Sequence, residues 1–283
     1  MKKERNLRMY LKKKQLIVAP GAFDALTAKI VERTGFPAVY LTGYGASANL
    51  LGAPDIGILT LTEMVRHAKY MVESVNIPVI ADADTGYGDS INITRTVEEY
   101  EKAGVSAIQL EDQVLSKRCG HMEGKEVVSC EEMVQRIKVA VKARKDKDLV
   151  IIARTDARAV YTLEEAIRRG NAYAKAGADV IFIEAMRSME EIKKVTKSIK
   201  TPLLINLIEK GKTPLINIEQ VRKFGFGIVI YPLSSLYASA KAVSDLMEEL
   251  KTKGTTEGMM KKMITFKKFN ELVGLSRYRK DAV

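Results

Sequence analysis

Residues 150–185 read VIIARTDARAVYTLEEAIRRGNAYAKAGADVIFIEA. Both ends of this stretch are β-branched runs, and the segment between them is amphipathic with the spacing of a helix. That segment begins with TLEE at 162–165, a pattern that caps helices, and it stops at Gly177. The order of strand, helix and strand predicts two parallel strands joined by a helical crossover.

The same unit repeats along the whole chain. Short apolar runs, each closed by polar or glycine residues, lie at 16–19, 38–42, 78–84, 107–112, 150–156, 180–185, 202–207 and 228–233. Amphipathic stretches between them lie at 62–74, 93–103, 130–143, 163–176, 189–198 and 218–224. Eight such repeats predict an α/β fold, a (β/α)8 TIM barrel, with a doubly wound open sheet as the alternative.

The positions of the polar residues favour the barrel. Polar side chains stand at the C-terminal ends of the predicted strands, and in a barrel these ends form one rim that carries the active site. After Gly254 the chain becomes helical in pattern and rich in Met and Lys, without further strands. We therefore expect a catalytic barrel domain at 1–254, with a short basic N-terminal segment, and a C-terminal helical extension at 255–283.

Charge and composition exclude several classes of protein. The net charge is +11, but seven Lys and Arg lie within residues 1–14 and nine within residues 251–283, so the body is near neutral. Because few aromatic residues accompany these cations, we expect no nucleic-acid partner. No apolar run is long enough to cross a membrane, and the basic N-terminus lacks the apolar core of a signal peptide. Two cysteines agree with a reducing compartment, so we expect a cytoplasmic protein.

Cys119 lies in the segment KRCGH at 117–121. Nearby cations stabilise a thiolate, so a cysteine in this setting can exchange a proton near neutral pH. A basic surface loop with an incidental cysteine has the same composition. The residues alone leave these two interpretations open.

Asp82 and Asp84 follow a predicted strand and bracket one alanine, which puts both carboxylates on the same side. Hard oxygen donors without histidine or cysteine partners suit Mg²⁺, with Mn²⁺ as a substitute. A simple turn is the alternative, because DTGYG at 84–88 also has turn composition. Glu111, at the end of the next predicted strand, favours the metal site.

Arg154 and Glu184 end neighbouring predicted strands. Since buried charges are costly unless they are paired, a structural ion pair is one interpretation. The other is that Arg154 binds a substrate carboxylate or a developing oxyanion, for which its planar guanidinium is suited, and we favour this one. Asn206 offers an amide at the end of the seventh strand, although it could equally cap a loop. His67 lies within a predicted helix and is expected to pack.

Taken together, the motifs resemble the isocitrate lyase and phosphoenolpyruvate mutase superfamily, in its methylisocitrate lyase-like branch. The resemblance extends from about residue 14 to 280 and rests on Thr42-Gly43-Tyr44-Gly45, Asp55, Asp82-Ala83-Asp84-Thr85-Gly86-Tyr87-Gly88, Glu111-Asp112-Gln113, Lys117-Arg118-Cys119-Gly120-His121, Ala153-Arg154-Thr155-Asp156-Ala157 and Tyr231-Pro232-Leu233. It implies an Mg²⁺-dependent carbon–carbon lyase acting on small hydroxy or keto carboxylates. It also implies a homotetramer, a dimer of dimers in which the eighth helix is exchanged.

The resemblance also implies the role of each site residue. Asp82 and Asp84 anchor the metal directly or through water, with Glu111 and Asp55 around them. Arg154 stabilises the alkoxide formed by deprotonation, for which Tyr40 is a candidate, and Cys119 on a mobile loop protonates the leaving carbanion. The substrate-binding residues are Thr42, Gly43, Tyr44, Gly120, His121, Arg154, Glu184 and Asn206.

One departure bears on the substrate. Relatives that cleave methylisocitrate carry two late arginines for the succinyl carboxylates, and here Tyr237 and Phe266 occupy those positions. Ile208 also replaces a hydroxyl residue of many relatives. Losing cations weakens the binding of a tricarboxylate, so we expect a 2-alkylmalate, cleaved by a retro-aldol step to pyruvate or another α-keto acid. The alternatives are a carboxyphosphonoenolpyruvate phosphonomutase, an oxaloacetate hydrolase and a basic binding protein without catalytic activity.

Overall fold

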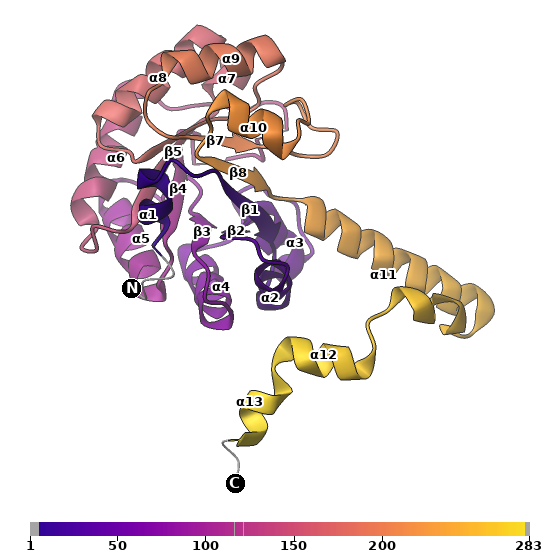
Figure 1. Ribbon diagram of the computed structural model, residues 1–283. Helices are drawn as coiled ribbons and strands as arrows, with labels where there is room; N and C mark the ends of the chain where they lie inside the picture. The colour runs from indigo at the N-terminus through magenta and orange to yellow at the C-terminus, as the bar shows by residue number, and fades with distance from the viewer. Residues whose placement is uncertain (1–5, 116, 121, 281–283) are drawn as a thin grey trace.

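Eight parallel strands close into a barrel in the computed structural model, which describes residues 6–115, 117–120 and 122–280 (Figure 1). Each strand pairs with the next, and β8 pairs back onto β1. The strands are β1 (Ile17–Ala22), β2 (Val39–Leu41), β3 (Val79–Asp82), β4 (Ala107–Glu111), β5 (Val150–Thr155), β6 (Val180–Ile183), β7 (Leu203–Asn206) and β8 (Ile228–Tyr231). The predicted TIM barrel is confirmed, and the open-sheet alternative is excluded.

Helices follow the strands, and most of them surround the barrel (Figure 1). They are α1 (Leu7–Lys12), α2 (Ala25–Arg33), α3 (Gly43–Leu51), α4 (Leu61–Ser74), α5 (Ser90–Ala103), α6 (Cys130–Ala143), α7 (Ala157–Val160), α8 (Leu163–Lys175), α9 (Met189–Ser198), α10 (Ile218–Phe224), α11 (Ser234–Lys253), α12 (Phe266–Val273) and α13 (Leu275–Lys280), with a 3-10 helix η2 (Glu257–Lys262). The six helices expected from amphipathic spacing are all present. Helices α1, α2 and α3 were not among those predicted.

Local sequence signals set the helix ends. Ser129 and Thr162 accept hydrogen bonds from the backbone N–H groups of Glu132 and Glu165, so the predicted cap at Thr162 is confirmed and Ser129 caps α6 in the same way. Gly104 and Gly225 end α5 and α10 in the left-handed region of the backbone, where glycine carries no steric penalty. These stops start each following strand at a defined position.

The barrel interior is a packed core. Its apolar members are Ile17, Ala19, Ala38, Tyr40, Ile80, Ala107, Val150, Ile152, Val180, Phe182, Leu204, Ile228 and Ile230. Leu7 of α1 is fully buried among them, so α1 closes the N-terminal end of the barrel. The opposite, C-terminal rim is where a barrel of this kind holds its ligand.

A long connection between β4 and α6 covers part of this rim. We call its described part, residues 113–115, 117–120 and 122–128, the lid. The two limbs of the lid pair at their base, where the N–H of Val114 donates to the carbonyl of Glu126 at 3.2 Å and Gln113 forms a bridge with Val127. The N–H of Val128 donates to the carbonyl of Asp112 at 2.9 Å and joins this base to the end of β4.

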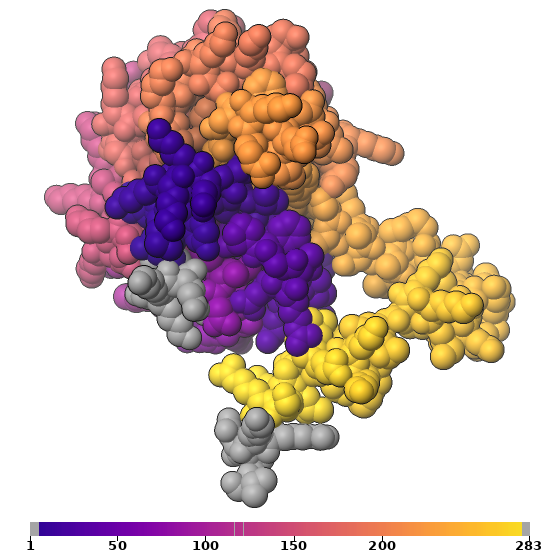
Figure 2. All heavy atoms as spheres, viewed as in Figure 1, coloured from indigo at the N-terminus to yellow at the C-terminus, as the bar shows by residue number. Residues whose placement is uncertain are grey.

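The last part of the chain leaves the barrel as an arm, residues 234–280. Helix α11 projects away from the body, and the segment through η2, α12 and α13 turns back toward α2 (Figures 1 and 2). Arg33 of α2 donates a hydrogen bond to the carbonyl of Glu271 in α12. Large apolar side chains along the arm are exposed, namely Tyr237, Val243, Met247, Leu250, Met260, Met263, Ile264, Phe266, Phe269 and Tyr278. Within the described residues, no helix combines the length and apolar character needed to span a membrane.

Candidate active site

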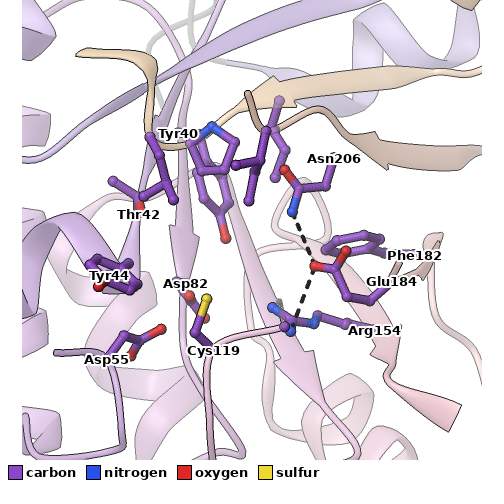
Figure 3. A pocket seen from close by; sticks show the side chains of 15 residues that line it. Tyr40, Thr42, Tyr44, Asp55, Asp82, Cys119, Arg154, Phe182, Glu184 and Asn206 are labelled. Carbon is purple, nitrogen blue, oxygen red and sulfur yellow. Dashed lines mark hydrogen bonds and ion pairs between the residues drawn. The ribbon is translucent and has the colours of Figure 1, made fainter. Parts of the chain in front are cut away.

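A pocket of about 370 Å³, partly open to solvent, lies at the C-terminal rim beneath the lid (Figure 3). Its lining residues are Tyr40, Thr42, Tyr44, Asp55, Asp82, Cys119, Gly120, Arg154, Phe182, Glu184, Asn206, Ile208, Ile230, Pro232 and Leu233. One part of this wall is charged and polar, and the part contributed by β8 and its following loop is apolar. The C-terminal ends of the strands form one rim and therefore bring most of the predicted site residues together.

Four carboxylates form an acidic cluster at one side of this pocket: Asp55, Asp82, Asp84 and Glu111. Asp84 has a φ of 46°, which turns the chain sharply after β3, and its N–H donates to Oδ1 of Asp82 at 3.1 Å. The ammonium of Lys117, from the lid, lies 2.5 Å from Oδ1 of Asp55 and 2.7 Å from Oδ1 of Asp84. Lys117 therefore fastens the lid to the acidic cluster.

Burial of the acidic cluster makes the charged form of its carboxyl groups unfavourable. Burial raises the pKa of Asp55, Asp82 and Asp84, and Lys117 offsets this only in part. Burial raises the pKa of Glu111 well above its ordinary value, against the opposing effect of Arg154. A further positive charge in the cluster would relieve this cost.

The donor set fits a hard divalent cation. Every side chain of the acidic cluster offers carboxylate oxygens, and Oε1 of Glu111 is buried without a hydrogen-bond partner among the described residues. No three His, Cys, Asp or Glu side chains in the described part of the chain are close enough to hold a metal by themselves. Carboxylate oxygens together with water are the ligands that Mg²⁺ prefers.

Arg154, at the end of β5, lies at the centre of a buried ion-pair network. Its Nε and Nη2 donate to Asp156 at 2.9 and 3.1 Å, and its Nη1 lies 3.2 Å from Glu111. Nη2 is also 3.6 Å from Glu184, so the structural ion pair considered from the sequence is present. Four contacts fix the guanidinium at the pocket wall, where it can also face a bound anion (Figure 3).

Asn206 and Glu184 form a linked pair on β7 and at the end of β6. Nδ2 of Asn206 donates to Oε2 of Glu184 at 3.0 Å, and the N–H of Ala185 donates to Oε1 of Glu184 at 2.7 Å. The Oδ1 atom of Asn206 is buried and has no hydrogen-bond partner among the residues described. An unpaired acceptor at a pocket wall can accept a hydrogen bond from a hydroxyl group of a ligand.

Tyr40 reaches the pocket from β2, where its hydroxyl donates to Oε1 of Gln109 at 3.3 Å. Burial, together with the neighbouring Asp82, raises the pKa of Tyr40 well above its ordinary value, while Arg154 opposes that shift. The phenol is therefore a hydrogen-bond donor in this state. It can act as a base only where additional positive charge lowers its pKa.

The N-terminus of α3 points its first turn at the same pocket. Thr42 caps the helix through a 3.3 Å hydrogen bond from the N–H of Gly45, and the first backbone N–H groups of any helix lack intrahelical partners. A Cβ at Gly43 would lie 2.6 Å from Oδ2 of Asp82, so only glycine allows this approach. Thr42, Gly43 and Tyr44 are thus placed beside the acidic cluster, where their amides can bind an anion.

Cys119 projects from the lid into the pocket, beside Asp82 (Figure 3). Its N–H donates to the carbonyl of Asp55 at 3.1 Å, which holds this part of the lid down. Cys119 therefore lines the pocket, and its chemical role stays a prediction. His121 lies outside the described residues, whereas His67 is buried and contacts the carbonyl of Phe23 at 2.7 Å, as a packing residue does.

Two residues of the network were not predicted from the sequence. Asp156 follows Arg154 by two positions, and alternation along β5 could have placed both on one side. Lys125 contacts Asp156 Oδ1 at 2.8 Å and is buried, but its sequence context, Gly-Lys-Glu, is typical of an exposed turn. No signal in the sequence distinguishes it from the other lysines.

Comparison with known proteins gives matches along nearly the whole chain. The family model for phosphoenolpyruvate phosphomutase matches residues 7–251. The 2,3-dimethylmalate lyase of Eubacterium barkeri is 53% identical over 273 residues, covering 96% of this chain and 94% of the relative. The 2-methylisocitrate lyase of Aeropyrum pernix is 45% identical over 274 residues, covering 97% and 88%.

Solved structures with the same architecture carry related activities. A crystal structure of 2,3-dimethylmalate lyase, described as a PEP mutase/isocitrate lyase superfamily member, has a TM-score of 0.92 at 41% identity and covers 97% of this chain and 92% of its own. Phosphonopyruvate hydrolase in complex with oxalate and Mg²⁺ has a TM-score of 0.90 at 33% identity and covers 99% and 98%.

Proposed function

Because this chain belongs to the phosphoenolpyruvate phosphomutase family, within the PEP mutase/isocitrate lyase superfamily, we propose that it cleaves a 2-alkylmalate such as 2,3-dimethylmalate. The chain is a carbon–carbon lyase of that superfamily, and its relatives include 2,3-dimethylmalate and 2-methylisocitrate lyases. The observation that carries the proposal is the thiol of Cys119, held by the lid within the same pocket as Asp82 and Arg154. A lyase of this kind needs an acid at this place, because its leaving fragment is a carbanion.

Asp82 and Asp84 would hold Mg²⁺, or Mn²⁺ in its place, directly or through water, with Glu111 and Asp55 beside them. When bound, the ion supplies Lewis-acid stabilisation of negative charge on substrate oxygens. The carboxylate oxygens, the buried unpaired Oε1 of Glu111 and the raised pKa of these acids support this assignment. A fold relative that contains Mg²⁺ and oxalate supports it as well.

The chain's own residues divide the reaction between them. The amides of Thr42, Gly43 and Tyr44 bind the carboxylate next to the reacting carbon, and Arg154 stabilises the alkoxide. Tyr40 accepts the hydroxyl proton, which requires that neighbouring positive charge offset its raised pKa.

The carbon–carbon bond next to the alkoxide then breaks. Its electron pair passes to the leaving carbon, and the oxygen becomes the carbonyl of an α-keto acid. The thiol of Cys119 gives its proton to that carbon, which completes the carboxylate product. Gly120, Glu184 and Asn206 line the space in which this happens, and His121 keeps its assigned substrate-binding role as a prediction.

The pocket favours a small substrate with alkyl groups. Phe182, Ile208, Ile230, Pro232 and Leu233 form its apolar wall. Among the described lining residues, Arg154 is the one Lys or Arg side chain, and it already faces three carboxylates. A third substrate carboxylate would therefore lack a cation, whereas methyl groups match the apolar wall. Phe266 is 84% exposed on the arm and does not line the pocket.

A substrate panel tests the proposal directly. The protein with Mg²⁺ is incubated with 2,3-dimethylmalate, other 2-alkylmalates, 2-methylisocitrate, oxaloacetate and carboxyphosphonoenolpyruvate. Keto acid release is followed with a coupled dehydrogenase, except that oxaloacetate hydrolysis is followed by the loss of oxaloacetate and the appearance of oxalate. We expect kcat/KM for 2,3-dimethylmalate to exceed that for 2-methylisocitrate by at least about tenfold, the value of one lost charged hydrogen bond. Preference for oxaloacetate or the phosphonate would replace the proposal with hydrolase or mutase activity. Inactivity toward every compound would favour a binding protein.

The assembly proposed is a homotetramer of helix-exchanged dimers. The exposed apolar side chains of the arm support it, because a projecting helix with such a surface is costly in water unless another surface covers it. We further propose a cytoplasmic location, without nucleic-acid or membrane partners, which agrees with a chain that has two cysteines.

A further inference from the structure

Lys125 is a buried cation of the lid with no role in the reaction described above. Only 2% of its side chain is exposed, and a buried ammonium is stable only when its hydrogen bonds are satisfied. Its Nζ donates to the carbonyl of Gly120 and lies 2.8 Å from Oδ1 of Asp156. Lys125 therefore joins the tip of the lid to the end of β5.

Asp156 contacts Arg154 as well as Lys125, so it links the two cations. Asp156 is fully buried, and it accepts hydrogen bonds from Nε and Nη2 of Arg154 at 2.9 and 3.1 Å. Burial alone would raise the pKa of Asp156, but Arg154 and Lys125 outweigh it and lower the pKa to about 2. The carboxylate is thus charged and held between the two cations.

The lid has two lysine anchors on opposite sides of the thiol. Lys117 precedes Cys119 by two residues and contacts Asp55 and Asp84 in the acidic cluster. Lys125 follows it by six residues and contacts the side of the pocket that holds Arg154. Gly120 lies against that side so closely that a Cβ would be 2.5 Å from Nη2 of Arg154.

We propose that Lys125 is a positioning residue, a latch that holds the Gly120 carbonyl to Asp156 and so fixes Cys119 and Arg154 relative to each other. The consequence for catalysis rests on the proposed lyase function. The latch itself does not, because it concerns the lid of the protein without ligand.

The latch is tested by the reactivity of the two cysteines. The full-length protein without ligand is treated with iodoacetamide, and alkylation of Cys119 and Cys130 is followed separately by peptide mass spectrometry. In Lys125→Met we expect alkylation of Cys119 to be about tenfold faster or more, as for a lost charged hydrogen bond. Cys130 is buried on α6, so its rate stays at the wild-type value unless the whole fold loosens.

Matched variants separate the latch from a general loss of a lysine. Lys138→Met makes the same change at an exposed position of α6 and leaves both alkylation rates unchanged. Lys125→Arg keeps the charge and the donors, and it restores slow alkylation of Cys119. Lys125→Gln keeps one donor amide, so we expect an intermediate rate of Cys119 alkylation. This variant also tests the latch if Lys125→Met does not fold.

Two results would overturn the latch: wild-type alkylation of Cys119 in the folded Met or Gln variant, or a parallel rise at Cys119 and Cys130. In activity assays with the preferred substrate, kcat of Lys125→Met falls by a larger factor than KM rises, because both fixed groups act in the transition state. An unchanged kcat would remove the catalytic consequence. If the wild-type protein itself proves inactive, the proposed function fails while the alkylation ratio still decides the latch.

Discussion

Cys119 is the residue on which the proposed chemistry depends most directly. Replacing it with serine keeps the size of the side chain but removes an acid of suitable pKa, so we predict that kcat for the preferred malate falls by at least about a hundredfold. The acidic cluster, Arg154 and the α3 amides are untouched by this change. Binding of oxalate or pyruvate with Mg²⁺, measured by calorimetry, therefore stays within about threefold of wild type.

Cys130→Ser is the matched control, because Cys130 is buried on α6 outside the pocket and burial raises the pKa of its thiol. It keeps the wild-type kcat. Equal cleavage by Cys119→Ser and the wild-type protein would remove the thiol from the mechanism.

Gly120 is required by space rather than by backbone conformation. A Cβ at this position would lie 2.5 Å from Nη2 of Arg154 and 2.7 Å from Oε2 of Glu184, so Gly120→Ala must displace either the lid or these two side chains. We predict a loss of kcat/KM of about a hundredfold, the typical cost of a displacement near 1 Å, with little change in the midpoint of thermal unfolding.

Gly227→Ala is the control for this variant. Its added Cβ meets Leu11 at 3.3 Å, a contact far from the pocket that a flexible side chain can relieve. Its kcat/KM stays near wild type. Comparable activity in Gly120→Ala would show that the lid does not need to pack on Arg154 and Glu184.

Sequence reasoning placed Asp82, Arg154 and Cys119 in one site, and the structure agrees. The first two follow from a simple rule, since side chains at the C-terminal ends of parallel strands share a rim. Lys125 could not be found in this way, because its burial depends on how the lid folds over the barrel. A turn lysine and a buried latch have the same local sequence.

Among the elements, helix α8 contacts the base of the lid, and it carries a glutamate whose pKa makes the stability of the fold depend on pH. Arg169 of α8 donates to the carbonyl of Val128 at 2.8 Å and contacts Asp112 at 3.1 Å. Glu165 holds Arg169 at 2.8 Å and Arg168 at 2.7 Å. The hydrogen bonds from Arg168 and Arg169 outweigh partial burial and lower the pKa of Glu165 to about 2.

The lowered pKa of Glu165 predicts a pH-dependent effect of Glu165→Gln. The folded-state pKa lies below the ordinary value of 4.5, so the contribution of Glu165 is complete above that value and is lost as pH falls toward about 2. We expect Glu165→Gln to cost about 1–2 kcal/mol of unfolding free energy at pH 7 and much less near pH 2.5, as measured by urea denaturation.

Glu164→Gln on the same helix is the control, because Glu164 is exposed and contacts a surface lysine, Lys194. It leaves the unfolding free energy close to the wild-type value at both pH values, because exposed ion pairs contribute little to stability. A destabilisation by Glu165→Gln that is equal at pH 7 and pH 2.5 would contradict the assigned pKa.

At the level of elements, the eight strands could be predicted, whereas several helices, among them α3, and the course of α11 could not. Apolar runs of a few β-branched residues have one stable solution in a repeated strand–helix pattern, which is burial on both faces. Helix α3 is rich in Gly, Ala and Ser and carries only weak periodicity, so it was not predicted. Helix α11 has the composition of a barrel helix, and its departure from the barrel depends on contacts that no local pattern encodes.

For the whole molecule, the arm is the feature with the clearest consequence. Gly254 ends α11 with a φ of 67°, and the proposed domain boundary at this residue stays a prediction. We predict that a chain ending at Lys253 keeps the barrel but loses part of its assembly, because it lacks the exposed apolar side chains of η2, α12 and α13. Light scattering after size-exclusion chromatography measures the mass. If the shortened protein contains the same number of chains per particle as the full-length protein, the assembly depends on other surfaces.

Leu7 and its helix α1 close the N-terminal end of the barrel, so in the described part of the chain the pocket opens at the C-terminal rim. We expect both products of malate cleavage to leave by the route through which the substrate enters, past the lid that carries Cys119. We expect the fragment nearer the lid to depart before the one beneath it, so that the two acids leave in a fixed order. Inhibition patterns by the two acids would reveal that order.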